Sequence, residues 1–214
     1  MSATRITRFC LVRHGETHWN GEKRIQGQID IDLNAVGRSQ ASALRPALVD
    51  YSFAAIYSSD LLRALNTARI ATAGLGLAVS PAPTLRERHF GVLQGTTSHE
   101  ASRQYPEVHR HHQARTPDYD NLTGESLVAF AARVMAGLEE LAVRHAGGYV
   151  LAFTHGGVLD VAYRAATGRS LDQPRDFGLP NAALNWVERD AAGWRLVSWA
   201  DCRHLARALD EVSG

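Results

Sequence analysis

The fold is decided by a short apolar run that ends in a charged loop, Phe9-Cys10-Leu11-Val12-Arg13-His14-Gly15. Its four apolar residues are too few for a membrane span or for the core of a signal peptide. An apolar run that stops so abruptly is typical of a buried strand leading into a functional loop. We therefore predict a buried first strand over residues 9–12 and a functional loop that begins at Arg13.

Strands and helices alternate along the rest of the chain. Apolar spacing and capping residues predict helices at about 35–49, 61–73, 126–145 and 158–167, with Asn34, Ser58-Ser59-Asp60 and Gly168 as caps. Strands are predicted at 54–57, 77–80 and 149–153, and a hairpin at 183–188 and 194–199. This alternation predicts an α/β fold, a three-layer α/β/α sandwich with a mostly parallel central sheet and room for an antiparallel edge.

Composition and charge indicate one globular domain over residues 1–214. The chain is 45% hydrophobic and 21% charged, which suffices for a sizeable core. It has 23 basic and 22 acidic residues without a long run of one sign, so we expect no nucleic acid and no membrane among its partners. Two cysteines, Cys10 and Cys202, are too few for a disulfide framework or a thiolate metal site. We expect a cytoplasmic protein, and a homodimer stays open.

Two predicted strands end in a histidine followed by a glycine. His14 and Gly15 follow the first strand, and His155 and Gly156 follow the strand at 149–153. Parallel sheets place ligand sites at the carboxyl ends of their strands, so the two pairs indicate one shared site, although a single such histidine is more often structural. Arg13 beside His14, with a glycine that lets the backbone approach closely, suits a phosphoryl group as the target.

Several motifs together resemble the histidine phosphatase (phosphoglycerate mutase-like) superfamily. The first is Leu11-Val12-Arg13-His14-Gly15-Glu16-Thr17, followed by Trp19-Asn20. The others are Ser58-Ser59-Asp60-Leu61-Leu62-Arg63-Ala64 with Thr67-Ala68, Arg86-Glu87-Arg88-His89-Phe90-Gly91, Gly124-Glu125-Ser126 and Thr154-His155-Gly156-Gly157. They cover most of the chain in the order that the family shows.

The resemblance implies roles for particular residues. His14 would attack phosphorus, and Glu87 would act as general acid and then as general base. Cationic groups at Arg13, Arg63 and His155 would surround the transferred group, which needs no metal or other cofactor because fixed donors stabilise its spreading charge. The same pocket would be lined by Asn20, Gln26, Gly27 and Gly156. We also expect His14 to donate from one ring nitrogen to a carbonyl and to stay neutral.

Each assignment has a structural alternative. Arg63 could serve a purely structural role, although a cation in the first turn of a helix opposes the macrodipole and more naturally faces an anion. Glu87 could be a solvated partner of its charged neighbours. Asn20 and Gln26 could be ordinary turn residues. The run His109-Arg110-His111-His112 suggests a metal, but it lacks further ligands at a suitable spacing, and we predict a solvated surface there.

The reaction type is predicted from departures from the mutases of the family. Where the cofactor-dependent phosphoglycerate mutases carry a tyrosine, a lysine and an asparagine, this chain has Phe90, Ser98 and Gly157. These changes favour a phosphatase, similar to the metal-independent phosphoserine phosphatase-like and broad-specificity phosphatases, that hydrolyses a small phosphorylated metabolite. A mutase is the alternative, and a non-catalytic phosphate-binding protein is a more remote one.

A polar, histidine-rich segment at about 98–124 interrupts the α/β pattern. Its charged and aromatic side chains suit a small anionic metabolite; they are Arg103, Tyr105, His109, His111, His112 and Arg115. Because specificity in such folds is set by what covers the site, we predict that this insertion is a lid.

Overall fold

A six-stranded sheet forms the centre of the computed structural model, which describes residues 5–206. The ends of the predicted domain, 1–4 and 207–214, lie outside the described residues. The strand order is β3-β2-β4-β1-β5-β6. The strands are β1 Thr7–Arg13, β2 Phe53–Ser58, β3 Val79–Pro81, β4 Tyr149–Thr154, β5 Leu184–Asp190 and β6 Gly193–Asp201. The first four are mutually parallel, and the hairpin β5-β6 adds an antiparallel edge.

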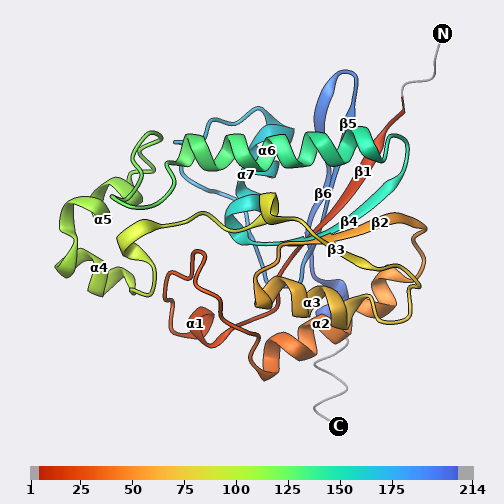
Figure 1. Ribbon diagram of the computed structural model, residues 1–214, viewed down its shortest axis with the longest axis horizontal. Coiled ribbons are helices and arrows are strands. Elements are labelled where there is room, and N and C mark those ends of the chain that lie inside the picture. The colour runs from red at the N-terminus through yellow and green to blue at the C-terminus, as the bar shows by residue number, and fades with distance from the viewer. Residues whose placement is uncertain (1–4, 207–214) are drawn as a thin grey trace.

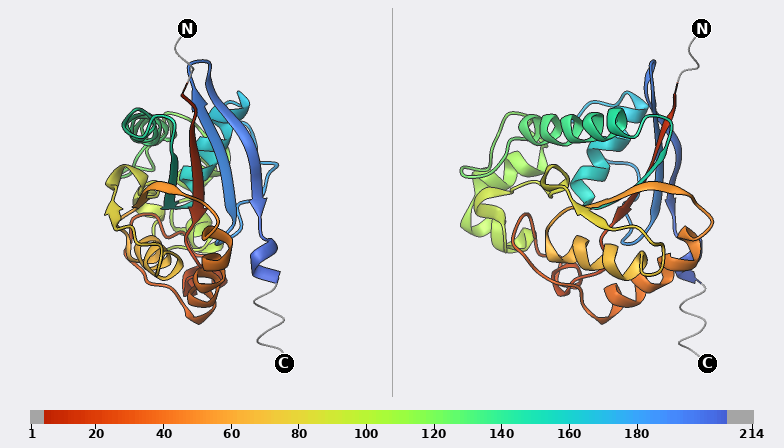
Figure 2. Two further views of the ribbon diagram at one scale, coloured as in Figure 1. Left: turned by 90° about the vertical axis from the view of Figure 1, so that its right-hand side faces the viewer. Right: turned by 45° about the vertical axis from the view of Figure 1, so that its right-hand side comes forward.

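Helices cover both faces of this sheet because the central strands are apolar on both sides. Along β1, Phe9 and Leu11 pack with α6 (Leu127–Arg144) and α7 (Gly156–Thr167). The alternate residues, Cys10 and Val12, pack with α2 (Ala35–Leu48) and α3 (Leu62–Ala71). Figures 1 and 2 show these two helix pairs on opposite sides of the sheet. The predicted three-layer α/β/α sandwich is confirmed.

Most predicted helix ends are confirmed, but the cap of α3 is not. Asn34 caps α2 through Gly37 N (2.8 Å), Ser126 caps α6, and Gly168 ends α7 in the left-handed conformation. Helix α3 instead begins after Leu61 without a side-chain cap. The serines and the aspartate predicted to cap it have other partners, as Ser59 contacts His155 and Asp60 pairs with Arg86. Long-range partners therefore outcompeted the local cap.

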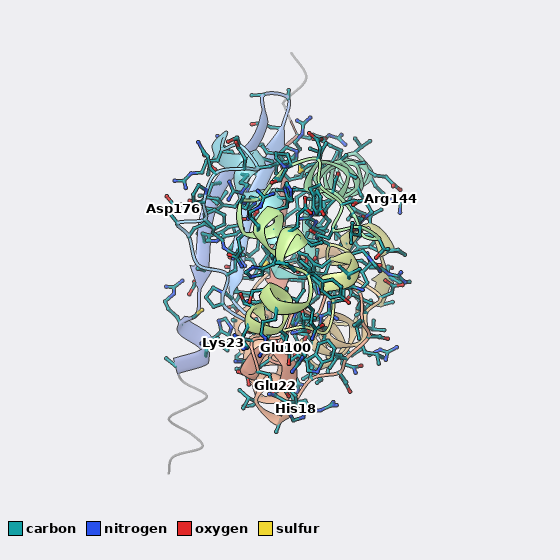
Figure 3. The ribbon with its side chains drawn as sticks, turned by 90° about the vertical axis from the view of Figure 1, so that its left-hand side faces the viewer. His18, Glu22, Lys23, Glu100, Arg144 and Asp176 are labelled. Atoms are coloured by element: carbon teal, nitrogen blue, oxygen red, sulfur yellow. The ribbon has the colours of Figure 1, made fainter. Side chains whose placement is uncertain are left out.

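The predicted lid contains two helices, α4 (Ser98–Gln104) and α5 (Pro106–Gln113), at one end of the sandwich (Figure 1). Figure 3 looks down onto them and shows Glu100 of α4 close to Glu22 and Lys23 of the loop after α1 (His18–Gly21). Arg24 joins the two segments, because its guanidinium binds Glu100 at 2.6 Å. Two single turns, Pro83–Leu85 and Gly91–Leu93, flank the loop of Glu87. No helix within residues 5–206 is long and apolar enough to cross a membrane.

Candidate active site

The two histidine-glycine pairs meet at the carboxyl edge of the sheet. Strands β1 and β4 are paired in parallel up to Arg13 and Thr154, and His14 N extends the pairing to Thr154 O (2.9 Å). The next residues in each strand, His14 and His155, therefore lie side by side, with ring centroids 5.3 Å apart. The shared site predicted from the two strand ends has this pair at its centre.

His14 is held as a neutral ring with one free nitrogen. Its side chain is buried, and Nδ1 lies 2.7 Å from Gly15 O. A carbonyl oxygen only accepts, so Nδ1 carries the proton and Nε2 keeps its lone pair. Burial, and then the charges of Arg63 and Arg13, hold the pKa of His14 well below its usual value. Gly15 is required here because a Cβ at this position would lie 2.4 Å from Gly37 O.

Two arginines, Arg63 buried and Arg13 half-buried, supply the positive charge around these rings. The Arg63 side chain, wholly buried at the start of α3, donates to Gly27 O (2.6 Å) and Ile29 O (2.9 Å). Burial lowers its pKa to about 10, so it remains charged at neutral pH. Arg13 donates to Leu179 O at 2.5 Å. Within residues 5–206 the Nε atoms of both arginines lack a hydrogen-bond partner, which leaves donors for an anion.

His155 differs from the expectation that it is cationic. It is fully buried, and Nε2 lies 2.8 Å from Ser59 Oγ. Burial, followed by the charges of Arg63, His14 and Arg13, holds the pKa of His155 well below its usual value. The free protein therefore presents two arginines and a neutral histidine, and an arriving phosphate dianion would favour protonation of this ring.

Glu87 lies across the pocket on the loop between the two short turns. Its carboxylate accepts from Arg88 N (2.8 Å) and from Gly157 N (2.9 Å) in the first turn of α7. A Cβ on Gly157 would lie 2.1 Å from Glu87 Oε1. A side chain at position 157 would therefore displace the Glu87 carboxylate. Gly157, which stands where the mutases carry an asparagine, leaves the space that this carboxylate occupies.

The predicted pocket residues of the first loop have mainly structural contacts. The Asn20 side-chain Oδ1 accepts from Thr17 N (3.0 Å) and Thr17 Oγ1 (3.1 Å) and so completes the capping box of α1. Gln26 Oε1 is buried and has no hydrogen-bond partner in the described part of the chain. Gly27 contributes its carbonyl, which orients Arg63. None of the three lines the pocket described below, whereas Gly156 does.

A cavity of about 600 Å³ opens beside this centre. Arg13, Glu87, Gly156 and Gly157 are among the residues that line it. Of the side chains that made the lid a candidate for binding, only His112 and Arg115 reach it. Sequence reasoning missed the other polar residues that line the cavity, which are Arg88, Gln113, Asp160 and Arg175. Asp160 had a signal, as the one acidic residue of the helix predicted at 158–167, but Arg175 had none.

The lid histidines have partners other than a metal. His111 stacks on Tyr119 with ring centroids 4.2 Å apart, and His112 meets the Phe90 ring edge-on at 5.4 Å. Burial lowers the pKa of His112 to about 4, so this pocket residue is neutral at physiological pH. Across residues 5–206 no three His, Cys, Asp or Glu side chains are grouped so that they could hold a metal ion.

Comparison with known proteins places the chain in a family. The model of the histidine phosphatase superfamily (branch 1) matches residues 9–202. The metal-independent phosphoserine phosphatase of Arabidopsis thaliana is 41% identical over 94% of this chain and 84% of its own length. Phosphoglycerate mutase-like protein 4 of the same plant is 36% identical over 92% and 86%. The solved structure of Bacillus stearothermophilus YhfR matches with a TM-score of 0.87 at 32% identity, over 93% of this chain and 99% of its own. The chain is therefore an enzyme of the histidine phosphatase superfamily.

Proposed function

We propose that this protein is a metal-independent phosphomonoesterase that hydrolyses a small phosphorylated metabolite through a phosphohistidine on His14. One observation carries the proposal: His14 is neutral, its Nδ1 proton is bound by Gly15 O, its ring lies beside His155, and the charges of Arg63 and Arg13 act on it. An unprotonated ring nitrogen beside fixed cations is what a nucleophile for phosphorus requires.

In the first step, the Nε2 lone pair of His14 forms a bond to phosphorus while the ester P–O bond breaks. The leaving oxygen takes the electron pair of that bond and a proton from Glu87. The free donors of Arg13 and Arg63 stabilise the charge on the equatorial oxygens. In the second step, Glu87 accepts a proton from water, the water oxygen attacks phosphorus, and the N–P bond returns its electrons to His14.

The pocket supports hydrolysis over isomerisation. A mutase must hold its product while it reorients, and must exclude water from the phosphohistidine. Of the three positions where mutases carry polar substrate contacts, Phe90 presents an apolar ring to the pocket and Gly157 has no side chain. Ser98 does not line the cavity, and its Oγ lies 2.9 Å from His109 Nε2 within the lid. The α4-α5 lid borders the cavity through His112 and Arg115, which suits a closing element.

The test is phosphate release from purified protein in excess chelator. The panel contains phosphoserine, for which the Arabidopsis relative is named, together with phosphoglycerates, sugar phosphates and an aryl phosphate. We expect substantial release with little isomerisation, and loss of turnover in a folded His14→Ala variant. Retained turnover in His14→Ala would refute the mechanism. Isomerisation of phosphoglycerate would restore the mutase, and no reaction in either assay would favour a phosphate-binding protein.

A further inference from the structure

The cavity carries positive charge that the proposed phosphoryl transfer does not use. Three arginines from separate segments line it: Arg88 after Glu87, Arg115 after α5, and Arg175 in the loop after α7. We propose that they form a second anion subsite, and that the substrate is a monoester whose leaving alcohol carries another anionic group. This inference rests on the proposed phosphatase, because it concerns the leaving half of the same substrate.

Arg88 is a buried cation without a carboxylate partner. Its guanidinium donates to Glu125 O (2.8 Å) and Tyr119 O (3.0 Å), and it is 6% exposed. In the described part of the chain no carboxylate oxygen lies within 4.0 Å of its side-chain nitrogens. The nearby Glu125 carboxylate is committed to Arg133, at 2.7 Å. Burying a charge costs free energy unless an opposite charge pairs with it. An anionic ligand would therefore supply the ion-pair partner that Arg88 lacks.

Arg115 is held at the cavity wall in a strained backbone conformation. Its φ is 53°, in the left-handed region that few residues other than glycine adopt. Its Nε donates to Leu171 O (2.8 Å) and its Nη2 to Asp160 Oδ2 (2.6 Å). The same oxygen also accepts from Arg164 Nε at 3.1 Å. One carboxylate shared by two guanidinium groups leaves one positive charge in excess.

Arg175 stands at the rim with its side chain free. Over residues 5–206 that side chain forms neither a hydrogen bond nor an ion pair, and its neighbour Asp176 pairs with Arg169. The loop itself is fixed, because Arg164 donates to Gln173 O (2.9 Å) and Phe177 stacks on Tyr163 at 3.8 Å. Figure 3 shows Asp176, the residue after Arg175, on the side of β5 and β6. Arg175 thus lines the same cavity as His112 and Arg115 from a loop that is fixed by its own contacts.

These groups share one chemistry, recognition of a carboxylate or of a second phosphate. Guanidinium groups bind both, and bonds to ionised partners are the stronger ones. Nearby carboxylates offset only part of this charge, because Glu87 and Glu125 act on Arg88 while Asp160 is shared by two arginines. A neutral leaving group would leave the remaining positive charge of Arg88, Arg115 and Arg175 without a ligand anion.

The experiment compares substrates that differ only in the second anion. 3-Phosphoglycerate is paired with glycerol 3-phosphate, phosphoserine with phosphoethanolamine, and fructose 1,6-bisphosphate with fructose 6-phosphate. We expect kcat/KM to be at least about tenfold higher for the anionic member of a carboxylate pair, a phosphate pair or both, which also identifies the anion. Arg175→Ala should reduce that ratio about tenfold, chiefly through KM. Arg103→Ala, an exposed arginine of α4 outside the cavity, is the matched control and should leave the ratio unchanged.

Equal kcat/KM within every pair, or a preference that survives in Arg175→Ala, would overturn the subsite. Failure of the phosphatase proposal has a different signature, namely no release from any ester, including an aryl phosphate. In that case calorimetric binding of 3-phosphoglycerate and glycerol 3-phosphate to the wild type and to Arg175→Ala decides the subsite. Tighter binding of the carboxylate that is lost in the variant supports it, and equal binding refutes it.

Discussion

The place of Glu87 depends on the absence of a side chain at Gly157, and Gly157→Ala tests this dependence. The added Cβ would lie 2.1 Å from Glu87 Oε1 and 3.1 Å from Phe130 Cε1. Since ordinary contacts begin near 3.4 Å, the carboxylate must move by about 1 Å, a displacement that can cost on the order of 10²-fold in rate. The fold should survive, because alanine is preferred over glycine in a helix by about 0.5–1 kcal/mol.

We therefore expect kcat for alkyl phosphates to fall about 100-fold while the melting temperature stays the same or rises. The loss should be much smaller for an aryl phosphate, whose leaving group needs little protonation. Steady-state phosphate release on both ester types measures the effect. Gly21→Ala is the matched control, because its added Cβ meets no atom within 4 Å. An alkyl-phosphate kcat that stays within twofold of wild type would refute the argument that this glycine positions the general acid.

Three further outcomes follow from the same contacts. Glu87→Gln should lower kcat by about 10²–10⁴-fold, most with poor leaving groups, and a uniform loss across esters of different leaving-group pKa would contradict its role as acid. Because burial holds the pKa of His14 and His155 below 6.5, the unfolded chain binds more protons than the folded protein below that pH. The free energy of unfolding should therefore fall as pH drops below 6.5, by up to about 1.4 kcal/mol per pH unit for each histidine, and urea titrations at pH 7 and 5.5 measure it. Asp160→Asn removes the charge that two arginines share and should destabilise the fold by about 3–5 kcal/mol, whereas Asp176→Asn in an exposed pair should cost about 1 kcal/mol or less in the same titrations.

Local patterns predicted most of the fold. The apolar run at 9–12, the spacing of the long helix at 126–145 and the capping Asn34 all identify their elements, because these signals are read within a few residues. The cap of α3 failed for the opposite reason: Ser59 and Asp60 have local potential, but their partners, His155 and Arg86, come from distant segments. A homodimer stays a prediction, since a single chain does not test it.

The sequence by itself determined the α/β order and the two histidine-glycine strand ends, because the carboxyl ends of parallel strands must share an edge. Only the tertiary structure decided which groups surround those two histidines. The carbonyl that fixes Arg63, the glycine that makes room for the Glu87 carboxylate, and the three further arginines of the cavity all come from segments far apart in the chain. Their contacts depend on how loops pack against the finished sandwich. That packing cannot be predicted from periodicity or capping rules, whereas a strand or a helix is encoded in its own residues.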